Sequence, residues 1–269
     1  MSNHSSNSPI GATGLPSSGH AISPYLLEGR SHGQLTDEEK AILSDLVFEK
    51  REIEARSTIV RRNEELDISL LCMSGIVSRQ RDDRKGRRQL LSLHFPGDFL
   101  DLHAYPLKYL DHDVGALSDV TLAVFKHADL RQLQYDHPDL TRKLWFATLL
   151  DAAVHRQWIW RIGTLRAVAR VAHFFAECHA RLVGIGIADK STFDLALKQT
   201  DIAEVVGITA IHTNRVLREL REREVAYFKD GTVEIADLKE LWKLAEFEPS
   251  YLYLDDQALA RIWSGEAVS

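Results

Sequence analysis

The chain has 269 residues, 45% of them hydrophobic, so it is long enough to bury the cores of two domains of ordinary size. No apolar run approaches the roughly 20 residues of a membrane-spanning helix, and the start of the chain lacks the features of a secretory signal, so we expect a cytoplasmic protein without a membrane partner. The chain has only two cysteines, which excludes a disulfide scaffold and a four-cysteine cluster. Because its net charge is −6, any nucleic-acid binding must use a local surface.

The first part of the chain, residues 1–33, is rich in Ser, Gly, Pro and Asn and has no hydrophobic period. This composition predicts a disordered tail. A short helix is expected from Thr36 to about Phe48, because Thr36 and Glu39 have the spacing of a capping box.

Residues 34–135 form the first predicted domain. Short apolar runs bounded by turn residues predict strands at Ile68–Met73, Ile76–Ser78, Leu90–Phe95 and Val120–Phe125. The polar segment Asp82–Gly86 contains a glycine and predicts a hairpin between the second and third strands. Many short strands joined by turns indicate a β-sandwich or jelly roll.

A long helix with a hinge is predicted over residues 136–163, because Pro138 suits the first helical turn and Gly163 ends the pattern. Its apolar stripe, which Trp145, Leu149 and Ile159 widen, is broader than one small domain needs. We therefore expect the helix to pack against a second copy of itself. The predicted dimer interface consists of Leu140, Leu144, Ala147, Val154, Trp158 and Arg161. Packing entirely on its own β-domain is the alternative for this stripe.

The last predicted domain covers residues 164–247 and contains a helix-turn-helix at Gln199–Leu220. Ile202 and Val216 are apolar where two short helices meet, Gly207 permits the tight turn, and Thr209 can cap the second helix. Two helices of a larger helical core are the alternative interpretation.

Two short strands are predicted directly after the helix-turn-helix, at Val225–Phe228 and Val233–Ile235, around an Asp-Gly turn. This hairpin is typical of the wing in a winged helix-turn-helix. A short helix at Asp237–Phe247 and a tail at residues 248–269 complete the chain. The predicted fold class is α+β: a β-sandwich or jelly-roll domain, a long dimerisation helix and a winged helix-turn-helix domain.

The second helix of the motif presents polar side chains that suit double-stranded DNA. Arg215 can donate two hydrogen bonds to guanine, Asn214 can pair with adenine, and Ile211 can contact a thymine methyl group. These three are the predicted base contacts. The predicted phosphate contacts are Gln199, Thr200, Thr209, His212, Arg218 and Arg221.

The order of these parts resembles the Crp/Fnr family of bacterial transcription regulators over about residues 35–245. The strongest matches are Ser74–Val77, Phe95–Phe99 and Gln199–Leu220. The resemblance implies a homodimer whose recognition helices enter successive major grooves of a palindromic site, with RNA polymerase as a further partner. Ile211 stands where the family commonly carries an acidic residue that reads cytosine, so a different half-site is expected.

The residues that bind a cyclic phosphate in this family are not matched. Its cyclic-nucleotide binders use a Gly-Glu pair after the Pro-Gly-Asp-Phe turn and an Arg-Ser pair before the next strand. The corresponding stretches here are Leu100–His103 and Tyr109–His112, which contain Asp101 and Asp111. Two carboxylates would repel a phosphate, so we expect that cyclic AMP does not bind and that the protein has no cofactor.

Two other functions remain open from the sequence. A haem-responsive regulator would use a histidine of the β-domain, and a redox-responsive one would use Cys178. The candidate haem ligands are His94, His103, His112 and His127. A metal-dependent enzyme on the β-sandwich would need closely grouped His and Glu residues, which the strands lack, so we expect no enzymatic activity.

Overall fold

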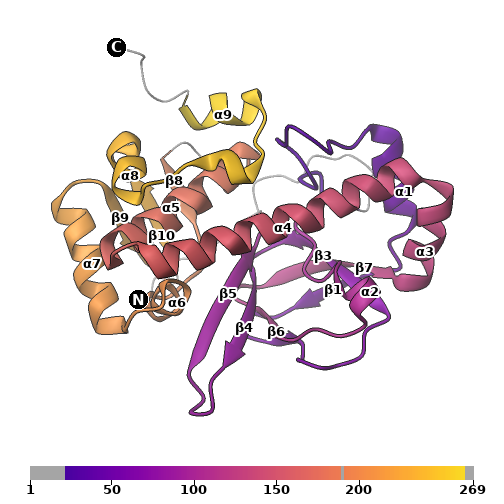
Figure 1. The fold of residues 1–269 in the computed structure, drawn as a ribbon, viewed down its shortest axis with the longest axis horizontal. Coiled ribbons are helices and arrows are strands. Elements are labelled where there is room, and N and C mark those ends of the chain that lie inside the picture. The colour runs from indigo at the N-terminus through magenta and orange to yellow at the C-terminus, as the bar shows by residue number, and fades with distance from the viewer. Residues whose placement is uncertain (1–21, 189–190, 264–269) are drawn as a thin grey trace, which may run out of the picture.

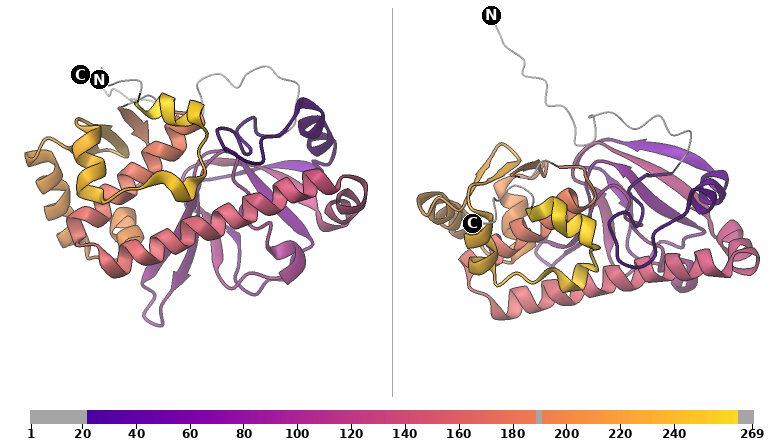
Figure 2. Two further views of the ribbon diagram at one scale, coloured as in Figure 1. Left: turned by 45° about the horizontal axis from the view of Figure 1, so that its top comes forward. Right: turned by 90° about the horizontal axis from the view of Figure 1, so that it is seen from above.

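The computed structural model describes residues 22–188 and 191–263, and it contains a β-domain, one long helix and a mainly helical C-terminal domain (Figure 1). The long helix, α4 (Pro138–Thr164), begins with proline in its first turn, as predicted. Seen from above in Figure 2, α4 runs along one edge of the molecule, and both domains lie on the same side of it. Within the described residues, no helix has the length and apolar character needed to cross a membrane.

The β-domain consists of two antiparallel sheets, which confirms the predicted β-sandwich. One sheet has the order β1-β7-β3, and the other has the order β2-β6-β4-β5. Their strands are β1 (Glu49–Ile53), β2 (Thr58–Val60), β3 (Ile68–Ser74), β4 (Val77–Asp82), β5 (Arg88–His94), β6 (Asp113–Ala116) and β7 (Val120–Lys126). The predicted hairpin joins β4 and β5, and β1, β2 and β6 were not predicted.

Alternate residues of β3 and β7 face two different cores, because successive side chains of a strand point to opposite sides. Cys72 and Leu122 pack between the two sheets. Leu71 and Phe125 face the other way, toward α1 (Asp37–Asp45), α3 (His127–Asp136) and α4. A four-residue helix, α2 (Ala104–Leu107), follows β5. The capping box of α1 is confirmed by hydrogen bonds in both directions between Thr36 and Glu39.

The C-terminal domain is built around α5 (Ala167–Gly184), whose central residues are fully buried. Around it lie β8 (Thr192–Asp194), α6 (Gln199–Val206), α7 (Ala210–Glu222), β9 (Ala226–Lys229), β10 (Thr232–Ile235) and α8 (Leu238–Ala245). Phe174 and Phe175 of α5 share one core with Leu93 and Phe95 of the β-domain. The two domains are therefore joined by continuous apolar packing, and α4 is not their only connection.

The predicted tails are wrong where the structure describes them. Residues 22–33 contribute buried Ile22, Leu26 and Leu27 to the core beside α1, whereas residues 1–21 lie outside the described part of the chain. Residues 248–263 form a 3-10 helix, η1 (Pro249–Leu252), and a helix, α9 (Asp256–Trp263), and residues 264–269 are not described. Composition did not reveal this packing because its partners are distant in sequence.

The two terminal segments bind each other. Arg30 forms a β-bridge with Leu254, and its Nη1 donates to the carbonyl of Leu252 at 2.7 Å. The backbone N–H of Ser31 donates to the Tyr253 carbonyl at 2.8 Å. In Figure 2 these segments lie side by side between the β-domain and the C-terminal domain. Each segment thus supplies hydrogen-bond partners for polar groups of the other segment that are shielded from water.

We predict that Leu252→Ala lowers the free energy of unfolding by about 2–5 kcal/mol, since the Leu252 side chain has no exposed surface and its removal leaves a cavity. Leu107→Ala is the matched control, because Leu107 is 58% exposed, and we expect a change within about 0.5 kcal/mol. Urea unfolding of both variants measures the difference. Equal small effects would mean that residues 248–263 behave as a tail.

Candidate DNA-binding surface

The two helices of the predicted motif form as expected, with α6 and α7 joined by a tight turn. Gly207 ends α6 with a φ of 68°, which is a left-handed conformation that glycine adopts without strain. Thr209 caps α7, because its hydroxyl oxygen accepts a hydrogen bond from the N–H of His212 at 3.2 Å. Ile202 and Val216 are buried between the helices. These local interactions determine the angle at which α7 leaves the turn.

One face of α7 is exposed and carries the three predicted base contacts. Ile211 is 72% exposed, and Asn214 and Arg215 are exposed beside it. The opposite face buries Thr213, Val216, Leu217 and Leu220 in the domain core. An amphipathic helix with an apolar inner face and an outer Asn and Arg is suited to enter a DNA groove.

The predicted phosphate contacts are all exposed and lie on α6, α7 and the turn between them. They are Gln199, Thr200, Thr209, His212, Arg218 and Arg221. Gln199 accepts a hydrogen bond from the Asn214 amide at 3.3 Å, which links the start of α6 to the middle of α7. The structure therefore brings these residues to one surface together with the predicted base contacts.

The wing adds residues that the sequence analysis did not single out. β9 and β10 form the predicted hairpin, and β8 joins it as a third strand on the other side of β10. A groove between α7 and the wing is lined by Arg218 and Arg221 on one side and by Tyr227 and Lys229 on the other. The position of Lys229 next to the Asp-Gly turn was the sequence signal for this cation.

The charge of the exposed α7 face is positive where DNA contact is predicted. Arg223 and Glu219 form an ion pair with each other at the C-terminal end of the helix. Among residues 22–188 and 191–263, no ion pair involves Arg215, Arg218 or Arg221. These three guanidinium groups are therefore available to an anionic partner, even though the chain as a whole is acidic.

The predicted dimer stripe on α4 is wrong. Leu140, Leu144, Val154, Trp158 and Arg161 are buried against the chain's own domains. Ala147 is partly buried and packs against the same core. Side chains that are covered within one chain cannot also contact a second copy. The alternative interpretation, in which this stripe packs within its own chain, therefore describes this face.

The opposite face of α4 carries the exposed apolar side chains. Trp145 is 64% exposed, Leu149 52% and Ile159 73%. With Ala152 and Arg156 between them, these positions are separated alternately by four and three residues, so they form one line along the helix. We call Trp145, Leu149, Ala152, Arg156 and Ile159 the outer line of α4.

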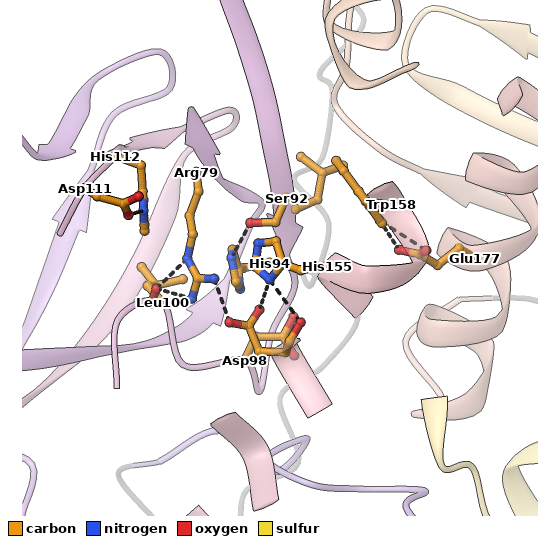
Figure 3. A network of polar contacts seen from close by, with 12 residues as sticks. Arg79, Ser92, His94, Asp98, Leu100, Asp111, His112, His155, Trp158 and Glu177 are labelled. Atoms are coloured by element: carbon orange, nitrogen blue, oxygen red, sulfur yellow. Dashed lines mark hydrogen bonds and ion pairs between the residues drawn. The ribbon is translucent and has the colours of Figure 1, made fainter. Parts of the chain in front are cut away.

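On its inner side, α4 closes a polar site in the β-domain (Figure 3). Arg79 of β4 is 3% exposed, and its Nη1 donates to Asp151 of α4 at 2.6 Å. Its other nitrogens donate to the Leu100 carbonyl at 3.0 and 2.6 Å. The adjacent cavity has a volume of about 50 Å³, whereas pockets for small organic ligands usually measure about 300–1,000 Å³.

The two stretches that correspond in position to the family's phosphate-binding segments, Leu100–His103 and Tyr109–His112, meet in space. His103 and His112 lie with their ring centroids 5.9 Å apart. Asp101 is fully buried, where its Oδ1 accepts from the Leu70 N–H at 2.7 Å and its Oδ2 has no partner. Burial raises the pKa of Asp101 from 3.8 to about 7. Asp101 thus supports strand β3, and within the described residues its carboxyl group forms no ion pair, although the Arg79 charge partly offsets the effect of burial.

The other candidate sensor residues hold structural hydrogen bonds. His94 lies 2.9 Å from the Ser92 hydroxyl, His112 lies 2.8 Å from Asp111, and His127 lies 3.1 Å from the Ser69 hydroxyl. Burial lowers the pKa of His103 to about 4. In the described residues, no group of three or more His, Cys, Asp or Glu side chains is arranged to hold a metal ion.

Both cysteines are buried free thiols. Burial raises the pKa of the Cys72 and Cys178 thiols, whereas reactive cysteines have a lowered pKa and an accessible sulfur. The structure therefore offers no observation in favour of a cysteine-based redox response.

Comparison with known proteins matches both domains. Residues 50–137 match the cyclic nucleotide-binding domain family, and residues 169–244 match the Crp-like helix-turn-helix domain family. The transcriptional activator protein FnrL of Cereibacter sphaeroides is 24% identical over 201 residues, which cover 74% of this chain and 77% of FnrL. The nitrogen fixation regulation protein FixK of Rhizobium meliloti is 28% identical over 153 residues, 56% of this chain and 65% of FixK.

Solved structures show the same fold. FixK2 from Bradyrhizobium japonicum superposes with a TM-score of 0.67 at 22% identity, and the match covers 73% of this chain and 96% of FixK2. A CRP/FNR-family regulator from Thermus thermophilus gives a TM-score of 0.56 at 22% identity, over 74% and 99% of the two chains. With the two domain families in this order and an exposed recognition helix beside a wing, the chain belongs to the Crp/Fnr family of DNA-binding transcription regulators.

Proposed function

We propose that this regulator binds a palindromic DNA site as a homodimer and reads bases with Ile211, Asn214 and Arg215. The observation that carries the proposal is the exposed face of α7, where these side chains project beside unpaired Arg218 and Arg221. Arginine can donate two parallel hydrogen bonds to guanine O6 and N7, and asparagine pairs in the same way with adenine. Gln199, Thr200, Thr209, His212, Arg218 and Arg221 then contact phosphates, which sets the register of the helix in the groove.

The outer line of α4 is the proposed dimer interface. Large apolar side chains at alternating spacings of four and three residues pack between parallel helices as in a coiled coil. Trp145, Leu149 and Ile159 would otherwise remain in water, and exposed apolar surfaces of this kind mark sites of association. Dimerisation through this line places two α7 helices on one assembly, as a two-fold symmetric site requires.

The proposed regulator acts without cyclic AMP. The buried Asp101 carboxyl group lies in one of the two segments that correspond in position to the family's phosphate-binding residues, and Asp111 lies in the other. Arg79, the buried arginine beside this region, is already paired with Asp151 and the Leu100 carbonyl. A phosphate would therefore meet carboxyl groups without a free guanidinium to neutralise it.

RNA polymerase is the proposed further partner, because FnrL and other relatives are named transcriptional activators. Selection from random duplex DNA, with no added ligand and at two salt concentrations, tests the main proposal. Enrichment of a two-fold symmetric motif with half-sites about one helical turn apart is the expected result. Failure of folded, dimeric protein to enrich any sequence would overturn it.

Substitution of two arginines on α7 should separate base reading from phosphate contact. We predict that Arg215→Ala costs about 1–3 kcal/mol on the selected site and relaxes preference at one base pair. Arg218→Ala should weaken binding to all sequences alike and reduce the slope of log K against log salt by about one. Fluorescence anisotropy across a salt series measures both effects. Wild-type affinity in both variants would show that α7 is not the reading helix.

The dimer interface is tested by placing a charge on the outer line. Ile159→Asp should convert the dimer to a monomer, because an unpaired carboxylate at a helix–helix contact is poorly tolerated. The control is Tyr135→Asp, since Tyr135 is 77% exposed on α3, away from the outer line, and this variant should remain dimeric. Analytical ultracentrifugation gives the mass of each. A dimeric Ile159→Asp protein would place the interface elsewhere.

The buried Asp101 predicts a specific pH dependence of stability. Its pKa is higher in the folded chain than in the unfolded one, so its contribution is present below pH 3.8 and is lost as pH rises through about 7. The stability of Asp101→Asn relative to wild type should therefore rise between pH 4 and pH 8, by up to about 4 kcal/mol.

Urea unfolding at several pH values measures this difference. Asp111→Asn is the control, because the hydrogen bond from His112 lowers the pKa of Asp111 below 3.8. Its contribution is therefore nearly complete above pH 4, so its difference from wild type should stay nearly constant between pH 4 and pH 8 and change, with the opposite sign, only at lower pH. A pH-independent difference for Asp101→Asn would show that Asp101 does not titrate in this range.

A further inference from the structure

Two arginines of the β-domain form ion pairs with α6, the first helix of the helix-turn-helix. Arg56 lies in the turn between β1 and β2, and its Nη1 donates to both carboxylate oxygens of Asp201 at 2.9 Å. Arg88, at the start of β5, donates from Nη2 to Asp201 at 2.7 Å and from Nε to Glu204 at 2.7 Å. Figure 1 shows α6 beside β5, on the inner side of the C-terminal domain. We call these four residues the α6 clamp.

The clamp is partly shielded from water. The Asp201 side chain is 2% exposed, whereas the Arg56 and Arg88 side chains are 33% and 28% exposed. A carboxylate buried to this extent depends on its cationic partners, because removing one of them leaves a charge that water cannot solvate. The attachment of α6 to the β-domain therefore has an energetic role that surface ion pairs usually lack.

Asp201 is also hydrogen-bonded to the backbone of the helix-turn-helix, so it links this backbone to the β-domain. Its Oδ2 accepts a hydrogen bond from the Lys198 N–H at 2.7 Å, at the start of α6. Helix α6 in turn packs against α7 through Ile202 and Val206. The position of the Asp201 carboxylate relative to Arg56 and Arg88 therefore helps to fix the direction in which α7 points, together with the shared apolar core of the two domains.

The clamp does not cover the DNA-binding surface. Gln199, Thr200 and Arg215 stay exposed while Asp201 and Glu204 face the β-domain. With Asp201 and Glu204 paired to the β-domain arginines, α7 consequently faces outward. Release of α6 would also leave the Asp201 charge without its guanidinium partners, close to the proposed phosphate contacts Gln199 and Thr200.

We infer that Arg56 and Arg88 are positioning residues for DNA recognition. They hold α6 and α7 at one orientation relative to the β-domain, so that the helix-turn-helix domains of both subunits of a dimer bind a site together. The inference rests on the proposed function, and it concerns residues outside the set of proposed DNA contacts. In two-headed binding, the second contact gains from a high effective concentration only when its geometry matches the site. A DNA-binding domain whose orientation is not fixed keeps its affinity for a single half-site but loses part of the gain from binding both half-sites at once.

The test compares two duplexes, one with both half-sites and one with a single half-site. Arg88→Ala should weaken binding to the full site by about tenfold or more and change half-site affinity by less than about twofold. Arg87→Ala is the matched control, because Arg87 lies in the same hairpin and, among residues 22–188 and 191–263, forms its ion pair with Asp83 four residues away. It should bind both duplexes like wild type. Equal weakening on both duplexes, or no weakening, would overturn the inference.

Conservative variants separate positioning from a general loss of structure. Arg88→Lys should recover only part of the full-site affinity, because one ammonium group cannot reproduce the guanidinium contacts to Asp201 and Glu204 together. Glu204→Ala removes one contact without leaving Asp201 unpaired, so it tests the clamp even if Arg88→Ala unfolds. The effects of Arg88→Ala and Glu204→Ala on full-site affinity should be non-additive. Additive effects would contradict a shared clamp.

Hydrogen exchange of the DNA-free dimer gives a readout that is independent of DNA. Arg88→Ala should accelerate exchange in α6 and in the α4–α5 connection around Leu165, and Arg87→Ala should leave both unchanged. Absence of DNA binding by the wild type would refute the proposed function alone. Unchanged exchange in Arg88→Ala would refute the clamp even if the wild type binds its site.

Discussion

The buried carboxylate of Glu177 is the point where the parts of the molecule meet. It accepts hydrogen bonds from the Trp158 indole of α4 at 2.9 and 3.1 Å (Figure 3). It also accepts one from the Tyr251 hydroxyl of η1 at 2.9 Å. Arg181 approaches it to 3.6 Å and also donates to Asp98 in the Pro-Gly-Asp turn at 2.6 Å. A charge without exposure persists only when such partners surround it. Trp158 belongs to α4, Tyr251 to η1, and Arg181 of α5 pairs in turn with Asp98 of the β-domain, so the burial of this one charge constrains the relative positions of all three.

The terminal segments extend this junction beyond the two family domains. Residues 22–34 and 249–263 lie outside the matched ranges 50–137 and 169–244. They nevertheless bury Leu252 and Ile262 in the core of the C-terminal domain, and Tyr253 contacts the ring of Phe146 on α4 at 5.8 Å between centroids. This contact reaches the half of α4 that packs on the β-domain. The segments therefore attach the C-terminal domain to α4 at a place far from the α4–α5 connection.

Features determined within a few residues were predictable from the sequence. The capping box at Thr36, the proline start of α4 and the left-handed Gly207 all depend on neighbours within one helical turn, and all form as expected. The buried face of α4 was not predictable, because both faces carry apolar residues and only the tertiary contacts of Leu144 and Trp158 distinguish core from surface. The same holds for the α6 clamp and for the terminal segments, whose partners lie more than one hundred residues away. Exposed α7 side chains were predictable because the helix-turn-helix pattern itself assigns the inner face.

The junction also bears on how such a regulator is controlled. Turning the C-terminal domain relative to the β-domain would separate Phe95 from Phe175 in their common core and expose the ion pairs of Glu177 and Asp201. Breaking one buried pair by removal of a partner typically costs about 3–5 kcal/mol. A ligand shifts such an equilibrium only by the difference between its affinities for the two states. A cavity of about 50 Å³ beside the Arg79–Asp151 pair offers few contacts from which that difference can arise. The orientation of the DNA-binding surface is thus held by contacts formed on folding, and any effector that changes this orientation must offset the loss of those contacts.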